Sequence, residues 1–252
     1  MFEVLILSIT QGITEFLPIS SSSHLIIFST FYEFAFSNLL LDISLHIGSF
    51  FAVLLFFKND LIDFLNNKNI FALILIGSMP VLILGCILVF FNLTDQLRKI
   101  EIIAWTTLIF GALLYISDKF SLKKEIKKDF NLKSAVFIGF LHSLSLIPGV
   151  SRSGIAITAG RFLGYKRVEA AKISFLLSIP TLFFLTMYGT YSLYEKNNLY
   201  FSQINLMSIF LSFIFSYLTI KYFLKFIEKF SLNIFIIYRI ILGSILIFYV
   251  YQ

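Results

Sequence analysis

Charge is what this sequence lacks most. Only 13% of its 252 residues are charged, whereas 58% are hydrophobic and 18% are aromatic. A soluble domain typically carries about 25% charged residues. The chain therefore has too little polar surface to stay in water as a globule, which excludes the soluble classes of protein. Because no linker rich in Pro, Gly or Ser divides it, we expect a single membrane domain over residues 1–252.

Cysteine is almost absent as well. The single cysteine, Cys86, excludes an internal disulfide and a cysteine-based metal site. Because it lies inside an apolar run, we expect it to serve as a small buried hydrophobic residue. The chain also lacks a Walker loop, a Rossmann glycine pattern, a zinc-ligand spacing and a GxSxG elbow, so none of these motifs supports an activity.

The formal net charge is +6, which in a soluble protein would suggest nucleic acid as a partner. Here the basic residues sit between apolar runs. Membrane topology explains that placement better, so we expect no nucleic-acid partner.

Six apolar runs are long enough, or nearly so, to cross a bilayer, which takes about 20 apolar residues in a helix. They cover residues 39–57, 70–91, 101–117, 171–194, 203–224 and 233–251. The third is short and would need tilt or long polar side chains at its ends. The sequence thus predicts an all-α polytopic membrane protein with about six spanning helices.

Two further apolar regions are interrupted in the middle. Residues 2–36 are broken by Pro18 and the serines that follow it, and residues 132–163 are broken by the run from Pro148 to Gly154. Irregular backbone at membrane depth is tolerated only where protein or a water-filled cavity receives its N–H and C=O groups. We therefore expect two re-entrant helical hairpins. Three spans separate them and three follow, which predicts two repeats of opposite orientation.

This topology divides the basic residues unevenly. One side collects fifteen: Lys58, Lys68, Lys119, Lys123, Lys124, Lys127, Lys128, Lys133, Arg161, Lys166, Arg167, Lys172, Lys221, Lys225 and Lys229. The other side collects three: Arg98, Lys99 and Lys196. The positive-inside rule assigns the first side to the cytoplasm, so both termini are expected to face outward.

The first broken region combines groups that suit phosphate chemistry. Gln11 and Glu15 are four residues apart and share a helix face. Ser20, Ser21, Ser22 and Ser23 then lead into His24. A serine-rich turn that opens a helix offers hydroxyl and N–H groups to a phosphate. Glu15 and His24 could exchange protons, or one of them could hold a metal ion.

Structural explanations exist for the same groups. Glu15 could be a carboxylate that pairs two helices, His24 could be a packing residue, and the serines could serve only as a helix cap. All of them fall within ten residues inside an apolar region, which favours a functional site because polar groups inside a membrane are costly.

The second broken region contains PGVSRSG, from Pro148 to Gly154. Arg152 has no acidic neighbour in the sequence and needs either a distant carboxylate such as Glu15 or an anionic ligand. Ser151 and Ser153 flank it, and Gly149 and Gly154 permit close approach of the backbone, as in a phosphate clamp.

Other polar residues in apolar runs are harder to assign. His142 could face the same cavity or serve only helix packing. We expect Asp42, His46, Tyr238 and Arg239 either to hold the site residues in position or to pair helices.

QGITEFLPISSSSHL (Gln11 to Leu25) and PGVSRSG resemble the two signature motifs of the bacterial undecaprenyl-diphosphate phosphatase family, also known as bacitracin-resistance proteins. Further segments resemble the family in family order: LDISLHIGSFFAVLLFF from Leu41, GSMPVLILG from Gly77, RVEAAKISFLLSIP from Arg167 and YRIILG from Tyr238.

The resemblance implies a membrane enzyme that hydrolyses undecaprenyl diphosphate to the monophosphate, which recycles the lipid carrier for peptidoglycan and confers bacitracin resistance. It implies six spans with two re-entrant hairpins, a bacterial cytoplasmic membrane, a site on the outer side and a divalent cation, Mg²⁺ or Ca²⁺, with Glu15 as a ligand. By motif position, Glu15, Ser21 and His24 match the catalytic residues. Arg152 matches the phosphate-binding arginine, with Ser151 and Ser153 beside it. From the serine-rich turn we expect Ser20 and Ser22 as further phosphate contacts.

Three positions depart from the common family pattern. Gln11 stands where many members have glutamate, which puts the metal site in doubt. Ser23 replaces the usual glycine before the histidine, and His142 stands where glutamine is common.

The attacking group is left open among Ser21, His24 and a water molecule, and a homodimer is also left open. The rival function is a polyprenyl-phosphate transporter without hydrolysis, since broken helices and inverted repeats suit transporters too. A structural membrane subunit would leave Glu15 and Arg152 without a role.

Overall fold

Six long apolar helices dominate the architecture. The computed structural model describes residues 2–31, 39–66, 68–120, 123–195 and 202–252, and within these ranges it is helical apart from turns and one isolated bridge between Lys124 and Tyr165. The helices that could cross a membrane by length and composition are α3 (Leu39–Phe56), α5 (Lys68–Phe90), α6 (Ile100–Asp118), α10 (Arg167–Glu195), α11 (Gln203–Lys229) and α12 (Asn233–Tyr251). The six predicted spans are therefore confirmed.

Two of these helices are longer than their apolar runs. Helix α10 has 29 residues and α11 has 27. Each includes a helical turn with charged residues at one end, which does not belong to the apolar run. Helix α6 has 19 residues, so the span that the sequence marks as short reaches a spanning length. The remaining elements are short: α4 (Lys58–Asn66), η1 (Asp95–Leu97) and α7 (Ile126–Asp129) connect the spans.

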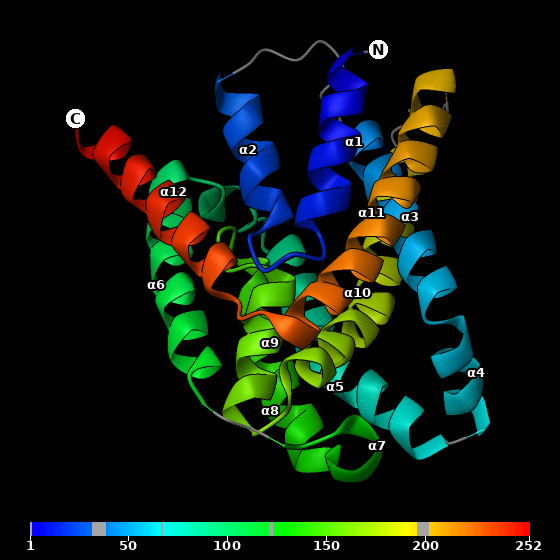
Figure 1. The fold of residues 1–252 in the computed structure, drawn as a ribbon. Helices are drawn as coiled ribbons and strands as arrows, with labels where there is room; N and C mark the ends of the chain where they lie inside the picture. The colour runs from blue at the N-terminus through cyan, green and yellow to red at the C-terminus, as the bar shows by residue number, and fades with distance from the viewer. Residues whose placement is uncertain (1, 32–38, 67, 121–122, 196–201) are drawn as a thin grey trace.

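Each broken region folds into a helical hairpin. The first pairs α1 (Phe2–Thr14) with α2 (Ser21–Phe31), and the second pairs α8 (Leu132–Ser143) with α9 (Arg152–Phe162) after the short η2 (Leu144–Leu146). Residues 32–36 of the first predicted hairpin lie outside the described residues. The hairpins enter the molecule from opposite ends, so that their turns approach each other near its middle (Figure 1). Both termini lie at the end from which the first hairpin enters.

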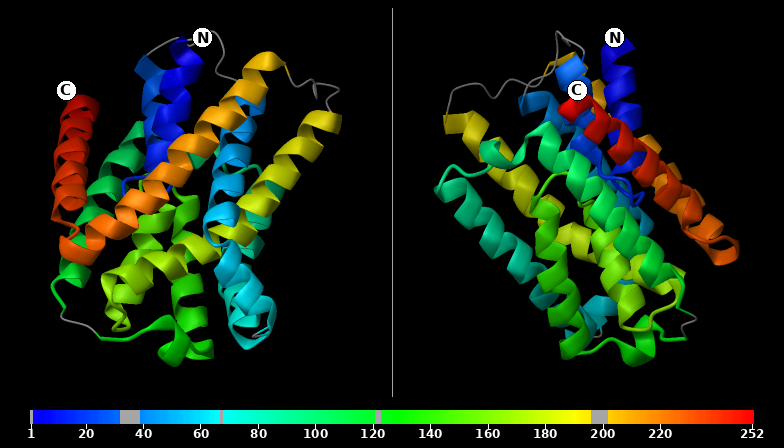
Figure 2. Two further views of the ribbon diagram at one scale, coloured as in Figure 1. Left: turned by 45° about the vertical axis from the view of Figure 1, so that its right-hand side comes forward. Right: turned by 90° about the vertical axis from the view of Figure 1, so that its left-hand side faces the viewer.

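The packing partners follow an inverted repeat. Helix α1 of the first hairpin packs against α11 of the second half, and α8 of the second hairpin packs against α5 of the first half. Helices α3 and α10 contact each other, as do α6 and α12, which lie side by side in all views (Figures 1 and 2). Such a reciprocal exchange of contacts is expected of two repeats, and the opposite entry of the two hairpins gives these repeats opposite orientation.

Small and hydroxylated residues allow the closest of these contacts. A Cβ atom on Gly48 of α3 would lie 2.3 Å from the Ile209 carbonyl oxygen of α11. The Ser49 hydroxyl lies 2.9 Å from that of Ser216 and 3.2 Å from that of Ser212. Close backbone approach and hydroxyl bonds replace the hydrophobic effect where helices associate in lipid.

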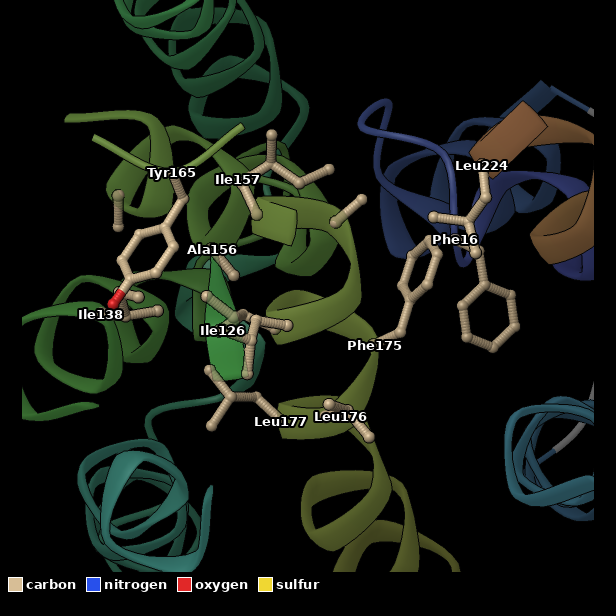
Figure 3. Packing of buried hydrophobic residues seen from close by; sticks show 14 of the residues in the cluster. Phe16, Ile126, Ile138, Ala156, Ile157, Tyr165, Phe175, Leu176, Leu177 and Leu224 are labelled. Atoms are coloured by element: carbon tan, nitrogen blue, oxygen red, sulfur yellow. The ribbon is translucent and has the colours of Figure 1, made fainter. Parts of the chain in front are cut away.

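The apolar core lies around the second hairpin and α10. Phe16, Ile157 and Phe175 belong to it and are almost fully buried, and Figure 3 shows Phe16 and Phe175 in contact. Their rings meet edge to face, with centroids 5.4 Å apart. Because Phe16 directly follows Glu15, this contact holds the turn of the first hairpin on α10.

Cys86 corrects one expectation from the sequence. It is exposed on α5 rather than buried. An apolar run in a membrane protein does not distinguish the face that packs on protein from the face that meets lipid, since both are apolar.

Arg239 of α12 joins the turns of both hairpins. Its side chain is fully buried and donates to the carbonyl oxygens of Pro18 (3.2 Å), Val150 (3.1 Å), Gly149 (2.8 Å) and Thr107 (3.2 Å). The first belongs to the first hairpin and the next two to the second. Arg239 therefore supplies donors to carbonyl groups that the broken helices leave unpaired, as irregular backbone at membrane depth requires.

Replacing Arg239 by methionine is expected to destabilise the protein by roughly 3 kcal/mol or more, because each buried carbonyl left without a donor costs about 1–3 kcal/mol. Thermal unfolding in detergent measures this loss. The matched control is Ile240→Met on the exposed face of the same helix, which should change stability little. If Arg239→Met unfolds at the wild-type temperature, the two turns do not depend on this side chain.

Candidate functional site

A cavity of about 300 Å³ lies where the two hairpin turns meet. Its lining comes from both hairpins, from α3 and α10, and from the segment around η1. The lining residues are Thr14, Glu15, Ser20, Ser21, Ser22, Leu25, Ile26, Asp42, His46, Thr94, Arg98, Ser145, Leu146, Pro148, Ser151, Arg152 and Leu185. Charged and hydroxylated groups thus gather between segments that are far apart in the sequence.

Glu15 is the centre of the polar contacts in this cavity. Its Oε2 atom accepts hydrogen bonds from the Ser21 hydroxyl at 2.6 Å and from the Gln11 amide at 3.0 Å. Its Oε1 atom lies 3.2 Å from Nη1 of Arg152. The Glu15 side chain is only 3% exposed, whereas Arg152 keeps 20% of its side chain exposed. The structure therefore brings Glu15, Ser21 and Arg152 together, and it places the ion pair that the sequence left open between Glu15 and Arg152.

The local sequence explains why Glu15 points into the cavity. Helix α1 ends at Thr14, and Pro18 disfavours helical conformation in the residue before it. Phe16 is buried in the core on the opposite side. Ser20 has φ of 73°, a left-handed conformation that turns the chain sharply into α2.

Two helix N-termini open onto the cavity. Helix α2 begins at Ser21 and α9 begins at Arg152, and Ser20, Ser22 and Ser151 line the cavity beside them. The Ser151 hydroxyl caps α9 by accepting from the Gly154 N–H at 3.1 Å. Helix N-termini present N–H groups and a partial positive charge to anions. This arrangement suits a phosphate group.

Ser153 does not line the cavity. Its hydroxyl donates to the Leu17 carbonyl at 2.7 Å and so ties the second hairpin to the first. One residue along a helix rotates a side chain by about 100°, which turns Ser153 away from Arg152, although its hydroxyl stays 3.3 Å from that of Ser151. Its predicted contact with phosphate stays a prediction.

His24 also lies away from the cavity lining and faces Tyr238 of α12. Its Nδ1 atom lies 2.6 Å from the Ser20 carbonyl, which can only accept, so Nδ1 carries the proton. Its Nε2 atom lies 2.6 Å from the Tyr238 hydroxyl, and the two rings stack with centroids 5.7 Å apart. Both ring nitrogens are engaged, and a catalytic role for His24 stays a prediction.

Three residues expected near the site do not line the cavity. His142 is fully buried, and neither ring nitrogen has a hydrogen-bond partner within the described residues. Gly149 has φ of +95° and packs on α6, where a Cβ atom would lie 1.9 Å from the Thr106 hydroxyl. A Cβ atom on Gly154 would lie 2.9 Å from Nη1 of Arg239. The two glycines thus make room for protein atoms.

Arg98 is the charged cavity residue that sequence reasoning did not assign to the site. It lies between η1 and α6, and nothing in its sequence neighbourhood marks it. Asp42 and His46 of α3, which were assigned to supporting or helix-pairing roles, also line the cavity. Their spacing of four residues on an apolar helix is the signal that could have placed them there.

The residues present offer a divalent cation a partial set of ligands. Within the described residues no three His, Cys, Asp or Glu side chains cluster. However, Gln11 Oε1 is buried without a hydrogen-bond partner beside Glu15. Hard cations such as Mg²⁺ are often held by one or two carboxylates together with substrate phosphates. The site therefore fits a cation that shares its ligands with a phosphorylated substrate.

Comparisons with known proteins identify the family of this chain. A family model described as bacitracin resistance protein BacA matches residues 4–245. The chain is 46% identical to the undecaprenyl-diphosphatase of Pelagibacter ubique, with 100% of this chain and 98% of the relative covered. It is 36% identical to a protein of the same name from Alcanivorax borkumensis, with 98% of each covered. A match of this extent establishes the family that the motifs indicated. The chain belongs to the bacitracin resistance protein BacA family.

Proposed function

We propose that this chain is an integral membrane phosphatase that hydrolyses undecaprenyl diphosphate to undecaprenyl phosphate and inorganic phosphate. The observation that carries the proposal is the set of contacts joining Ser21, Glu15 and Arg152 at one cavity. It combines a hydroxyl, a proton acceptor and a guanidinium, as phosphoryl transfer requires. The names of the family relatives support the same substrate.

Ser21 is the attacking group in this proposal. Its hydroxyl donates to Glu15 at 2.6 Å, so the carboxylate accepts the proton as the Ser21 oxygen bonds to the terminal phosphorus. The bond from that phosphorus to the bridging oxygen breaks, and undecaprenyl phosphate leaves. Water then attacks the phosphoserine, which releases phosphate and returns the proton to Ser21. His24 is a weaker candidate for attack because both of its nitrogens are engaged.

Arg152 and the N-termini of α2 and α9 stabilise the charge on the transferred phosphoryl group. Preformed donors aimed at developing charge supply a large share of catalysis in such reactions. Leu25, Ile26 and Leu185 give the same cavity an apolar side, which suits the first carbons of the prenyl chain while the rest stays in lipid.

Glu15 and Gln11 Oε1 would hold the divalent cation, Mg²⁺ or Ca²⁺, together with phosphate oxygens of the substrate. When bound, the cation neutralises phosphate charge. The chain's own residues position the diphosphate and move the proton between Ser21 and Glu15.

The basic residues support an orientation for this multi-pass membrane protein. The fifteen basic residues on the side of α4 and α7 belong in the cytoplasm by the positive-inside rule. The first hairpin, both termini and the cavity mouth near Arg98 then face outward, in the inner membrane of a bacterium. There the enzyme recycles the lipid carrier for peptidoglycan and confers resistance to bacitracin, which binds the diphosphate.

Phosphate release from undecaprenyl diphosphate by the purified protein in detergent tests the proposal. We expect release that needs Mg²⁺ or Ca²⁺ and that stops on chelation. Ser21→Ala, which retains the cavity but lacks the hydroxyl, serves as the inactive control.

Absence of release by folded protein under either cation would contradict the phosphatase proposal. It would favour the rival function, transport of the lipid without hydrolysis. The hydrogen bond from Ser21 to Glu15 argues against that rival, because binding alone does not require a hydroxyl poised on a carboxylate.

A further inference from the structure

A diphosphate carries two phosphate groups, and the residues assigned above account for one. Arg152 and the helix N-termini surround the place where Ser21 attacks the terminal phosphate. The other phosphate is also anionic and also enters the cavity. Charged groups elsewhere on the lining are therefore candidates for binding it.

Arg98 differs from the other four arginines in having no hydrogen-bond or ion-pair partner among the described residues. Arg152 pairs with Glu15, Arg161 and Arg167 pair with Asp118, and Arg239 binds carbonyl oxygens. The guanidinium of Arg98 makes no hydrogen bond within the described part of the chain, and the charged group nearest to it in effect is Asp42, which lines the same cavity. An exposed guanidinium at a cavity wall, with its donors free, is suited to a phosphate.

His46 completes the same wall. Of the three histidines, all within the described residues, His46 is the one that lines the cavity. Its Nδ1 atom lies 2.8 Å from the Asp42 carbonyl, which can only accept, so Nδ1 donates there. This bond fixes the ring and leaves Nε2 as the nitrogen available to a ligand. In its imidazolium form, Nε2–H donates to a phosphate oxygen.

We propose that Arg98 and His46 form a second phosphate subsite, which holds the phosphate that remains on the lipid while Arg152 holds the phosphate that is transferred. The subsite rests on the proposed phosphatase function and determines specificity for a diphosphate. The apolar residues Leu25 and Ile26 line the same cavity. The prenyl chain attached to this phosphate therefore passes along these two residues on its way out of the cavity.

The subsite acts on binding more than on the chemical step. The retained phosphate is bound in the substrate and in the transition state alike, and uniform binding changes KM without changing kcat. Loss of one charge-assisted contact with phosphate is expected to weaken binding about tenfold. The product, a prenyl monophosphate, should lose affinity by the same factor.

Arg98→Gln tests this, with Lys99→Gln as the matched control. Lys99 is the next residue, carries the same charge and is exposed, but does not line the cavity. With farnesyl diphosphate as the substrate, we expect Arg98→Gln to raise KM about tenfold and to keep kcat within twofold. Lys99→Gln should leave both constants unchanged.

His46→Ala should raise KM in the same direction, and inhibitors separate the two subsites. Farnesyl phosphate should inhibit the Arg98→Gln and His46→Ala variants about tenfold more weakly than the wild type. Inorganic phosphate, which is the product at the Arg152 subsite, should inhibit them unchanged. Thermal unfolding of each variant shows whether His46→Ala remains folded, and Arg98→Gln carries the test if it does not.

Unchanged KM and unchanged farnesyl phosphate inhibition in Arg98→Gln would overturn the subsite. So would an equal rise of KM in Lys99→Gln, which would mean that only general surface charge matters. Both results would leave the phosphatase function intact, because wild-type phosphate release and its loss in Ser21→Ala are measured separately.

Discussion

Arg152→Ala is expected to lower kcat by roughly 10²–10³-fold, the usual effect of removing one preformed donor to a developing charge. The guanidinium stands at the N-terminus of α9, 3.2 Å from Glu15 and partly exposed to the cavity. It is therefore placed to stabilise the negative charge that develops on the phosphoryl group as the bridging bond breaks. Phosphate release under saturating substrate measures the effect.

Arg152→Lys is the informative companion to this variant. A lysine keeps the positive charge but loses the planar pair of donors that matches a phosphate, so partial activity is expected. Thermal unfolding in detergent separates catalysis from folding, since the alanine variant leaves Glu15 without its ion-pair partner. Full activity in a folded Arg152→Ala variant would rule out this arginine as the phosphate-binding group.

Glu15→Gln is expected to reduce kcat by roughly 10²–10⁴-fold, the usual contribution of a general base. The amide is nearly isosteric, so it retains the position 2.6 Å from the Ser21 hydroxyl but cannot take the proton. Glu3→Gln in α1, the helix that precedes Glu15, makes the same chemical change outside the cavity and should leave the rate unchanged.

Combining Glu15→Gln with Ser21→Ala distinguishes a shared role from separate ones. If Glu15 acts by activating Ser21, the double variant should be about as slow as either single variant, because residues that act as a unit are not additive. Additive losses would mean that Glu15 serves another step. Wild-type rates in folded Glu15→Gln would exclude the carboxylate as the base.

The membrane architecture followed from the composition and the hydropathy of the chain. Each spanning helix must satisfy its own backbone hydrogen bonds in lipid, so a run such as residues 233–251 has one stable conformation, and α12 covers Asn233–Tyr251. The same constraint makes Pro18 and Pro148 visible as interruptions. The hairpins and their inverted arrangement could therefore be predicted without knowing a single tertiary contact.

The candidate site could be predicted where its residues are neighbours in the sequence. Glu15 and Ser21 stand on either side of one turn, and the need of Arg152 for an anion suggested Glu15 as its partner. The direction in which a helix's side chains point, however, depends on how the helix is rotated about its own axis, and the packing of the helices sets that rotation. The motifs name Ser153 and His24 but do not reveal their hydrogen-bond partners, Leu17 and Tyr238, which only the structure gives.

Contacts between distant segments required the folded structure. Arg98 reaches the cavity because the segment after η1 passes beside α3, and Arg239 reaches both hairpin turns because α12 packs on α6. An apolar helix in a membrane has no polar face to reveal its orientation, since lipid and protein core are equally apolar. Which polar residues share a cavity is therefore set by the packing of helices, in which glycines and serines allow the close contacts.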